Sequence, residues 1–340
     1  MGATSPRAKS TKRLPVTPTV LLLGLVAAGC SEVRDLGSTA PRGPLPVDYR
    51  NPILIANDGA FDNWQGEYAI LLASSGGPKL VGIVVNKSNP WPDIDTNIEG
   101  WRGLVQAAKD SGIRDIPDPV SSIGPPLTRP TDGKIQSTVA NRSEGAWLIV
   151  ETSRRVGLPY RPLVVATGGR LTDVADAYLM DPTVTERVVV VSSLGTVTAS
   201  GGAMGNPNGE MDPWADAIVA KVFRFVQVSS FYDQLTDVPA SRVPSLPANP
   251  LGDWIATKQS KVWSLQQASD QVSVLAVGLP GFVTTAETVS VASLVGPSST
   301  TGPDLAADPA GSDWLVTQVS GGTATMRFWE ALTKTAAYGP

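Results

Sequence analysis

Two carboxylates follow the apolar run at residues 53–56. Residues 52–59 read Pro-Ile-Leu-Ile-Ala-Asn-Asp-Gly, and Asp62 lies four positions beyond Asp58. The run has the length and β-branched content of a buried strand, and Asn-Asp-Gly predicts a turn. An apolar stretch of helical length follows at residues 68–73. On an open α/β sheet built from such units, ligands bind outside the carboxyl ends of the strands. Asp58 and Asp62 are therefore candidates for chemistry, and an Asx-type turn with solvated carboxylates is the alternative.

Similar apolar runs recur along the chain and alternate with helical patterns. Further strands are expected at residues 80–85, 163–166, 188–191 and 225–228. Helices are expected at residues 97–111, 143–156, 172–179, 213–222, 254–267 and 270–277, and around 328–332. Ser143 and Thr172 are predicted to be helix caps. Strands that are apolar along their whole length indicate a parallel sheet covered on both faces. The predicted fold class is therefore α/β, an open, mostly parallel doubly wound sheet with helices on both faces.

Two stretches have less regular patterns. Residues 116–137 are rich in proline and are expected to be irregular, and residues 288–319 predict shorter strands joined by a polar loop at 297–312. No internal repeat and no break in composition follows residue 50. We therefore expect one domain over residues 51–340.

The first 50 residues predict export and anchoring. A basic segment precedes an apolar segment, residues 16–28, that is too short to span a membrane comfortably. Residues 26–30 read Val-Ala-Ala-Gly-Cys, which resembles the lipobox of bacterial lipoproteins. The resemblance implies a signal peptide over residues 1–29, lipidation of Cys30, and a location outside the cytoplasmic membrane, in the cell envelope. Residues 30–50 are rich in Gly, Pro and polar groups and predict a flexible tether. An ordinary secretory signal with a stray cysteine is the alternative.

Composition excludes several kinds of site. The chain has one cysteine and no histidine, so an intrachain disulfide, a His-ligated zinc and a Ser-His-Asp triad are all excluded. Residues 1–29 hold four of the 27 basic residues and none of the 31 acidic residues, so the remainder is acidic. An acidic chain argues against nucleic acid as a partner. At Asp58, a phosphatase-type nucleophile would need a second carboxylate two residues on, where Ala60 stands.

Five segments in order resemble the nucleoside hydrolases of the inosine-uridine-preferring type. Residues 56–63 read Ala-Asn-Asp-Gly-Ala-Phe-Asp-Asn, where that family has an Asp-x-Asp-Pro-Gly-x-Asp-Asp loop. Residues 82–89 keep the ends of its Gly-(Ile/Val)-x-x-Val-x-Gly-Asn pattern. Residues 167–175 match its Thr-Gly-Pro/Gly-Leu-Thr-Asn segment with one extra residue, residues 205–215 match its Gly-Asn…Asn-x-x-x-Asp-Pro stretch, and Ser269-Asp270 stands at its late His-Asp. The resemblance implies hydrolysis of N-glycosidic bonds, with a role in purine and pyrimidine salvage.

The resemblance also implies a calcium ion that holds the ribose hydroxyls and the attacking water. Asp58 matches the aspartate that binds calcium and takes the proton of the water, and Asp270 matches a second carboxylate ligand. Thr167 matches a ligand that offers its main-chain oxygen. Asn63 stands where the family has another calcium-binding aspartate, so one formal charge is missing from the predicted site.

The residues expected around the substrate come from the same segments. Asp62 matches a carboxylate that contacts a ribose hydroxyl, and Asn89 and Asn208 match amides around the sugar. Asn206 falls where the family has a ribose-binding glutamate. The expected partner is a small nucleoside or riboside, and the family forms dimers and tetramers, so a homo-oligomer is a further expectation.

Several departures favour a second hypothesis. Ala56 replaces the first aspartate of the loop, and Ser269 replaces a histidine proposed to protonate the leaving base. A serine is no useful proton donor near neutral pH, although a stacking tryptophan, Trp91 or Trp214, or Tyr232 could compensate. The alternative to an enzyme is a catalytically impaired protein that binds a ribosyl ligand or serves the envelope structurally. Asp270 and Asp212 also have a simpler interpretation, as helix N-caps.

Overall fold

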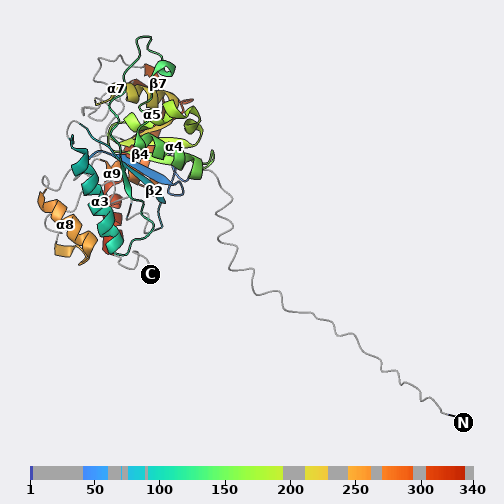
Figure 1. Ribbon diagram of the computed structural model, residues 1–340, viewed down its shortest axis with the longest axis vertical. Helices are drawn as coiled ribbons and strands as arrows, with labels where there is room; N and C mark the ends of the chain where they lie inside the picture. The colour runs from blue at the N-terminus through green and yellow to red at the C-terminus, as the bar shows by residue number, and fades with distance from the viewer. Residues whose placement is uncertain are drawn as a thin grey trace. The chain divides into compact units, whose positions relative to one another are not determined.

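The computed structural model describes residues 1–2, 41–59, 70, 76–88, 91–193, 211–228, 244–261, 270–293 and 304–333. The chain divides into two units, Met1–Ala40 and Pro41–Pro340. All the described helices and strands belong to the second unit, which Figure 1 shows as strands with helices packed around them.

Most strands of the described sheet are parallel. The strands are β1 (Ile53–Asn57), β2 (Leu80–Val85), β3 (Pro119–Ser121), β4 (Leu163–Thr167), β5 (Val188–Ser193), β6 (Arg224–Val228), β7 (Val283–Ser293), β8 (Asp304–Ala307) and β9 (Asp313–Val319). Their spatial order is β3-β2-β1-β4-β5-β6-β9-β7-β8. Only the pairs of β7 with β8 and β9 are antiparallel among these strands. The order runs outward in both directions from β1 and β4, so a topological switch point lies between these two strands.

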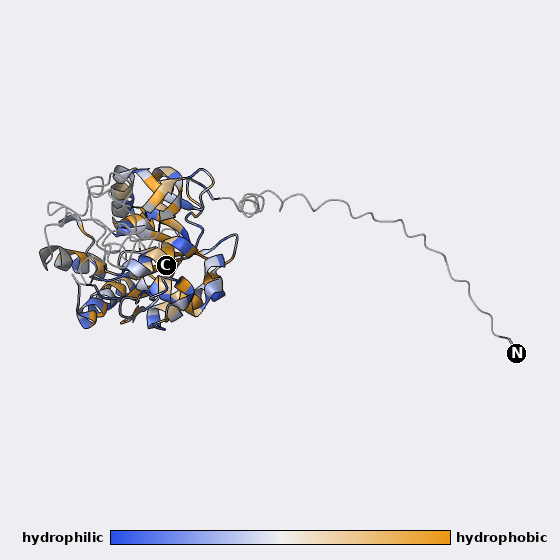
Figure 2. Cartoon of the chain, turned by 90° about the horizontal axis from the view of Figure 1, so that it is seen from above, coloured by the Kyte–Doolittle hydropathy of each residue, from blue (hydrophilic) through white to orange (hydrophobic). Residues whose placement is uncertain are grey.

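Helices cover both faces of the sheet, as predicted. They are α3 (Ile94–Asp110), α4 (Glu144–Val156), α5 (Thr172–Met180), α7 (Pro213–Val222), α8 (Pro250–Lys261), α9 (Gln271–Gly278) and α10 (Gly321–Thr333), with short 3-10 helices η1 (Ile135–Ser137) and η2 (Pro182–Glu186). Residues of α3, α8, α9 and α10 join one buried cluster, and residues of α4, α5 and α7 join the other. The helices carry both polar and apolar residues, as the mixed colours in Figure 2 show.

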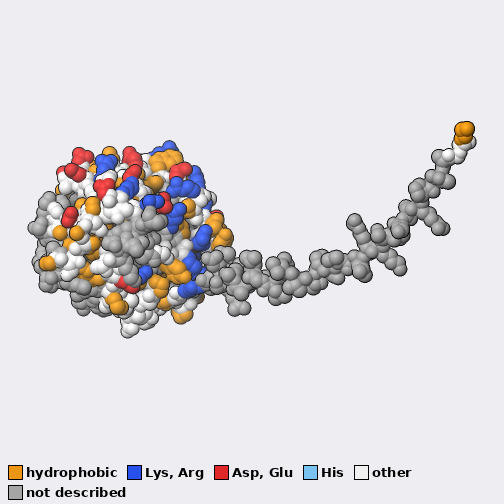
Figure 3. Space-filling view, turned by 90° about the horizontal axis from the view of Figure 1, so that it is seen from below, with side chains coloured by type: hydrophobic (Ala, Val, Ile, Leu, Met, Phe, Trp, Pro, Cys, Tyr) orange, Lys and Arg blue, Asp and Glu red, His pale blue; other side chains and the backbone are white. Residues whose placement is uncertain are grey.

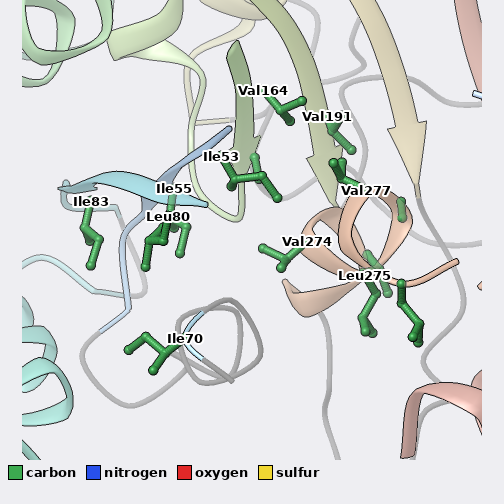
Figure 4. Close-up of a cluster of buried hydrophobic side chains, with 14 of the residues drawn as sticks. Ile53, Ile55, Ile70, Leu80, Ile83, Val164, Val191, Val274, Leu275 and Val277 are labelled. Atoms are coloured by element: carbon green, nitrogen blue, oxygen red, sulfur yellow. The ribbon is translucent and has the colours of Figure 1, made fainter. Parts of the chain in front are cut away.

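The strands contribute to both clusters in alternation. Ile53 and Ile55 of β1 belong to the cluster with α9, and Leu54 and Ala56 belong to the cluster with α4 and α5. Successive side chains of a strand point to opposite faces, so a strand buried on both faces must be apolar throughout. Figure 4 shows Ile53 and Ile55 in one cluster with α9. The expected strands and the mostly parallel sheet are thus confirmed.

Some elements differ from the sequence-based expectation. β3 and η1 lie within residues 116–137, which were expected to be irregular, and β8 lies within the expected loop at 297–312. β7 spans 11 residues and is longer than the strands expected there. Ser143 caps α4 as predicted, because its Oγ accepts a hydrogen bond from Ala146 N at 3.3 Å. Thr172 is not a cap: it is the first residue of α5, and its hydroxyl donates to Asp212 Oδ2 at 2.6 Å.

The described part of the predicted tether packs on the domain. Leu45 and Val47 are buried in the same cluster as β1. The Asp48 carboxylate accepts a hydrogen bond from Arg50 Nη2 at 2.6 Å, and Asn51 Nδ2 donates to Pro162 O at 2.8 Å. Burial of Leu45 and Val47 and the hydrogen bond from Asn51 hold this segment against the domain. None of the helices in the described residues has the length and apolar character needed to cross a membrane.

Candidate functional site

Polar residues end the central strands at the switch point. Asn57 ends β1 and Asp58 follows it, Asn86 follows β2, Thr167 ends β4 and Ser193 ends β5. Parallel pairing sets Asn57 opposite Val85, Ala56 opposite Thr167, and Thr167 opposite Ser192, so these ends lie at one edge of the sheet. This edge is where an open α/β sheet places its ligand site.

Asp58 is a buried carboxyl group whose charge is poorly solvated. Its side chain is 5% exposed, and burial raises its pKa to about 6, although a hydrogen bond with Ser88 and the charge of Arg170 each lower it. The Ser88 hydroxyl also accepts a hydrogen bond from Trp91 N at 3.3 Å, and Ser88 N donates to Trp91 O at 3.1 Å. Asp58 is therefore a group that can take up a proton near neutral pH.

Asp270 directs its carboxylate toward the strands and does not cap its helix. It occupies the N-cap position of α9 but makes no side-chain capping hydrogen bond. Asn57 Nδ2 donates to its Oδ2 at 3.0 Å, and Ser193 Oγ lies 3.1 Å from its Oδ1. Ser193 Oγ also lies 3.1 Å from Thr167 O. These contacts join α9 to the ends of β1, β4 and β5, and they contradict the interpretation of Asp270 as a side-chain cap.

The turn after β4 requires glycine at position 168 and is tightly packed at Gly169. A Cβ atom on Gly168 would lie 2.3 Å from Asn57 Nδ2 and 2.6 Å from Asp270 Cγ. A Cβ atom on Gly169 would lie 3.1 Å from Asn86 Oδ1 and 3.2 Å from Asp58 Cγ. The missing side chains thus allow the amides and carboxyl groups to approach the backbone of this turn closely.

Asn86 is held by three hydrogen bonds and keeps one unpaired atom. Its N donates to Asn57 O at 2.8 Å, its O accepts from Asn97 Nδ2 at 3.1 Å, and its Nδ2 donates to Asp173 Oδ2 at 3.1 Å. Its Oδ1 is buried and has no hydrogen-bond partner among the described residues. A buried acceptor without a donor is costly, so this oxygen is a candidate to pair with a group from outside the chain.

Arg170, the extra residue of the segment at residues 167–175, brings a buried cation to this edge. Its Nη2 donates to Gly124 O. The charge of Arg170 lowers the pKa of both Asp58 and Asp212, in opposition to burial, which raises both. Asp212 itself caps α7, because its Oδ1 accepts from Ala215 N at 3.0 Å, and its Oδ2 accepts from Leu127 N at 2.9 Å. The cap interpretation of Asp212 is therefore confirmed.

The two tryptophans suggested as base-stacking groups differ in their surroundings. Trp214 is buried in the cluster with α4 and α5, its Nε1 donates to Thr138 Oγ1 at 3.0 Å, and the Arg129 guanidinium lies 5.1 Å from the centre of its ring. These contacts make Trp214 a packing residue, so the suggestion that it stacks on a base is wrong. Trp91 is only partly buried and adjoins Ser88, the partner of Asp58.

The structure brings three of the predicted site residues together, which are Asp58, Thr167 and Asp270. Outside the described residues lie the other predicted positions: Cys30, Asp62, Asn63, Asn89, Asn206, Asn208, Tyr232 and Ser269. Sequence reasoning missed Asn57, Asn86 and Ser193, which are polar residues at the carboxyl ends of apolar strands. Their position at the carboxyl end of an apolar strand was the sequence feature that could have identified them as site residues.

The oxygen atoms at this edge are of the chemical types that a hard cation prefers as ligands. Asp58 and Asp270 offer carboxylates, Thr167 offers a carbonyl, and the partnerless Asn86 Oδ1 offers a neutral amide oxygen. Calcium prefers such an all-oxygen set of six to eight ligands. Among the described residues, however, no three acidic, cysteine or histidine side chains are grouped closely enough to hold a metal. A calcium here would need further oxygens, and Asp62 and Asn63 follow Asp58 closely in sequence.

Solved structures of nucleoside hydrolases share this fold. An inosine-guanosine nucleoside hydrolase aligns with a TM-score of 0.61 at 17% identity, over 83% of this chain and 98% of its own. A purine-preferring ribonucleoside hydrolase from Gardnerella vaginalis aligns with a TM-score of 0.59 at 18% identity, over 84% of this chain and 100% of its own. The inosine-uridine preferring nucleoside hydrolase from Bacillus anthracis aligns with a TM-score of 0.58 at 13% identity, over 85% of this chain and 100% of its own. No protein-family model and no curated protein sequence matches. The fold is therefore nucleoside hydrolase-like, as the sequence resemblance predicts.

Proposed function

We propose that this chain hydrolyses the N-glycosidic bond of ribonucleosides or related ribosides. One observation carries the proposal: in a nucleoside hydrolase-like fold, the buried carboxyl group of Asp58 lies at the switch point, and the carboxylate of Asp270 is held toward the same edge by Asn57 and Ser193. Both residues match acidic positions of the resembled family. The similarity in fold covers more than four fifths of the chain.

The chemistry of glycosidic cleavage accounts for the carboxylates. The bond breaks through an oxocarbenium-like state, which negative charge beside the sugar stabilises. A water molecule must also lose a proton as it attacks the anomeric carbon. Asp58 is our candidate base, because its pKa of about 6 makes it ionised, yet basic enough to accept a proton, near neutral pH.

We propose calcium as the cofactor. The residues that would hold it are Asp58, Asp270, Asn63 and the main-chain oxygen of Thr167. When bound, calcium would supply positive charge that binds the ribose hydroxyls and acidifies the attacking water. The all-oxygen character of the described groups supports this choice of metal over zinc, which prefers nitrogen and sulfur.

The remaining sequence-based assignments complete the proposal for the substrate. Asp62, Asn89, Asn206 and Asn208 are proposed to contact the sugar. The chain has no histidine to protonate a leaving base. We therefore expect an activated riboside, whose leaving group departs as an anion, to react faster than inosine or uridine.

The first experiment measures hydrolysis of nitrophenyl riboside, inosine and uridine, each with added calcium and with chelator. Calcium-dependent release of nitrophenolate by the wild type, and its loss in Asp58→Asn, would support the proposal. Asp118→Asn is the matched control, because Asp118 is an exposed carboxylate that pairs with Lys109 at 2.6 Å. No release from any of the three substrates by folded protein would contradict the proposal.

A second candidate function is ribosyl-ligand binding without turnover, or a structural role in the envelope. The observation in its favour is that Asn57 and Ser193 already contact both oxygens of Asp270. Such a carboxylate is satisfied without a metal. Isothermal titration with ribose and with inosine would distinguish the two: binding without hydrolysis, unaffected by chelator, would favour the binding protein.

We further propose that the protein is a lipoprotein of the cell envelope, anchored through Cys30 outside the cytoplasmic membrane. The lipobox-like residues 26–30 support this location. The test is detergent phase partition of protein made in a bacterium with the processing enzymes, beside Cys30→Ser. Partition of both forms into the aqueous phase would contradict the anchor. Size-exclusion chromatography with light scattering of the Cys30→Ser form tests the expected homo-oligomer.

A further inference from the structure

The amide of Asn86 presents a single atom to the site. The residue is 1% exposed, and its main-chain N and O and its Nδ2 are all paired within the protein. Only Oδ1 has no partner among the described residues. Whatever group pairs with this oxygen must be a hydrogen-bond donor or a cation, since a carbonyl oxygen can only accept.

Asp173 determines which way the amide faces. Its carboxylate is buried in α5 and accepts hydrogen bonds from Ser122 Oγ at 2.6 Å, Ser143 Oγ at 2.9 Å and Asn86 Nδ2 at 3.1 Å. A rotated amide would set the carbonyl oxygen of Asn86 against the carboxylate of Asp173, where two acceptors would repel. The network therefore holds Nδ2 toward α5 and leaves Oδ1 toward the turn after β4.

Asn86 Oδ1 and the carboxyl group of Asp58 both lie close to Gly169. Oδ1 lies 3.1 Å, and Asp58 Cγ 3.2 Å, from the position that a Cβ atom on Gly169 would occupy. Because both atoms lie within 3.2 Å of one point, they are close enough to each other for one water molecule to bridge them. An acceptor without a partner and a carboxyl group supply the two polar partners that a bound water requires.

We propose that Asn86 Oδ1 binds the water that attacks the substrate. This inference rests on the proposed hydrolysis. One O–H of the water donates to Asn86 Oδ1, and the other donates to Asp58. The water oxygen then forms a bond to the anomeric carbon as the glycosidic bond breaks. The proton of the water passes to Asp58, and the electron pair of the broken bond stays with the leaving group. Asn86 is thus a further catalytic residue, and Asp173 is the positioning residue that orients it.

Kinetics with nitrophenyl riboside test the role of Asn86. Asn86→Ala should lower kcat by about 10-fold to 100-fold, because misplacing the water is costly, with KM changed less than about threefold. Asp173→Asn should lower kcat in the same direction, because the amide at position 86 is then free to rotate. Thr152→Val is the matched control: Thr152 Oγ1 is another buried atom without a partner among the described residues, and it lies in the last two turns of α4. An unchanged kcat in Asn86→Ala would overturn the inference and leave the hydrolase proposal standing.

A crystal structure of the wild type keeps the inference testable if the chain proves inactive or Asn86→Ala does not fold. The expected result is an ordered water within hydrogen-bond distance of both Asn86 Oδ1 and an Asp58 oxygen, absent in Asn86→Ala where that variant folds. An empty space at Oδ1, or a protein donor in contact with it, would overturn the inference. A wild type that holds this water but hydrolyses no riboside would refute the proposed function alone, with Asn86 retained as a water-binding residue.

Discussion

Asn57 and Asp270 are 213 positions apart in sequence, and their side chains are joined by a 3.0 Å hydrogen bond from Nδ2 to Oδ2. The same Asn57 side chain accepts a hydrogen bond from Gly59 N at 2.9 Å, in the turn that carries Asp58. Trp101 of α3 holds that turn from another direction, because its Nε1 donates to Gly59 O at 2.7 Å. Asn57 therefore links the two carboxylates of the candidate site through one buried amide.

Removal of the Asn57 amide should destabilise the fold. Asn57→Leu removes the acceptor of Gly59 N and a hydrogen-bond donor to Asp270 Oδ2, and removing one partner of a buried hydrogen bond costs about 1–3 kcal/mol. We expect the free energy of unfolding, from urea denaturation, to fall by about 2 kcal/mol or more. Asp118→Asn, which removes an exposed ion pair, should change the free energy of unfolding by less than about 1 kcal/mol. Equal effects of the two variants would contradict the role of Asn57.

The turn after β4 should not tolerate a methyl group. In Gly168→Ala the new Cβ would lie 2.3 Å from Asn57 Nδ2, so the Asn57–Asp270 pair must move. Overpacking of this kind costs about 1–3 kcal/mol. Gly322→Ala is the matched control, because no atom lies within 4 Å of its Cβ position in α10 and alanine favours a helix. Thermal unfolding should show a lower Tm for Gly168→Ala and an unchanged or higher Tm for Gly322→Ala; the opposite order would count against the close packing.

The strands around these residues were predictable because their signal is local. β1, β2, β4 and β5 are apolar on both faces, which a parallel sheet requires, and their bounds agree with the sequence pattern to within two residues. β7 lacked that signal. It lies near the edge of the sheet, most of its residues are partly or fully exposed, and it contains Thr, Ser and Glu, so its sequence resembles a loop with short strands.

The site was predictable only in part, because its partners are distant in sequence. Asp58 and Asp270 stood out as carboxylates at the ends of apolar runs. Whether Asp270 caps α9 depends on Asn57 and Ser193, whose positions follow from strand order and register. Asn86 was unremarkable in sequence, because an asparagine after a strand is usually a turn former. Its significance appears once Asp173 occupies the other side of its amide.

One buried carboxyl group, Asp313, lies far from the candidate site and offers a control for pH effects. It differs from the charged side chains of both signs that lie on the surface shown in Figure 3. Asp313 begins β9, where it accepts a hydrogen bond from Phe225 N at 3.0 Å. Burial raises its pKa to about 6, although this hydrogen bond and the charge of Lys221 lower it. The folded state therefore binds more protons than the unfolded state between about pH 4 and pH 6, and Asp313 destabilises the fold as pH rises through that range.

Asp313→Asn should remove that pH-dependent loss. The amide keeps an oxygen for Phe225 N and carries no charge, so the variant should gain stability relative to the wild type as pH rises from 4 to 7. Urea unfolding at several pH values measures the difference. Riboside hydrolysis should be unchanged, because Asp313 lies at the start of β9, whereas the site lies where β1, β4 and β5 end. A constant difference in stability across this pH range would contradict the raised pKa.

Calcium should stabilise the wild type if Asp58 and Asp270 share the ion. A ligand at 100 times its Kd adds about 2.7 kcal/mol to the free energy of unfolding, so the Tm should rise with calcium and fall back with chelator. Asp270→Ala should abolish this gain. Asn63→Asp restores a charged ligand and should lower the Kd for calcium, measured by titration calorimetry. An equal rise in Tm in Asp270→Ala would exclude Asp270 from the calcium site.

The pH dependence of hydrolysis should report the ionisation of Asp58. Burial raises the pKa of this carboxyl to about 6, and the base must be ionised to accept a proton. Calcium bound to Asp58 would lower this pKa, because a cation favours the ionised carboxylate. With nitrophenyl riboside, whose leaving group needs no proton, kcat/KM should therefore rise about tenfold for each pH unit below the pKa of Asp58 in the calcium-loaded protein and level off above it. Asp58→Asn should lower kcat/KM by about 100-fold or more and abolish the rise. A rise of kcat/KM with pH that persists in Asp58→Asn at an undiminished rate would show that Asp58 is not the base, and the water would then need a different proton acceptor.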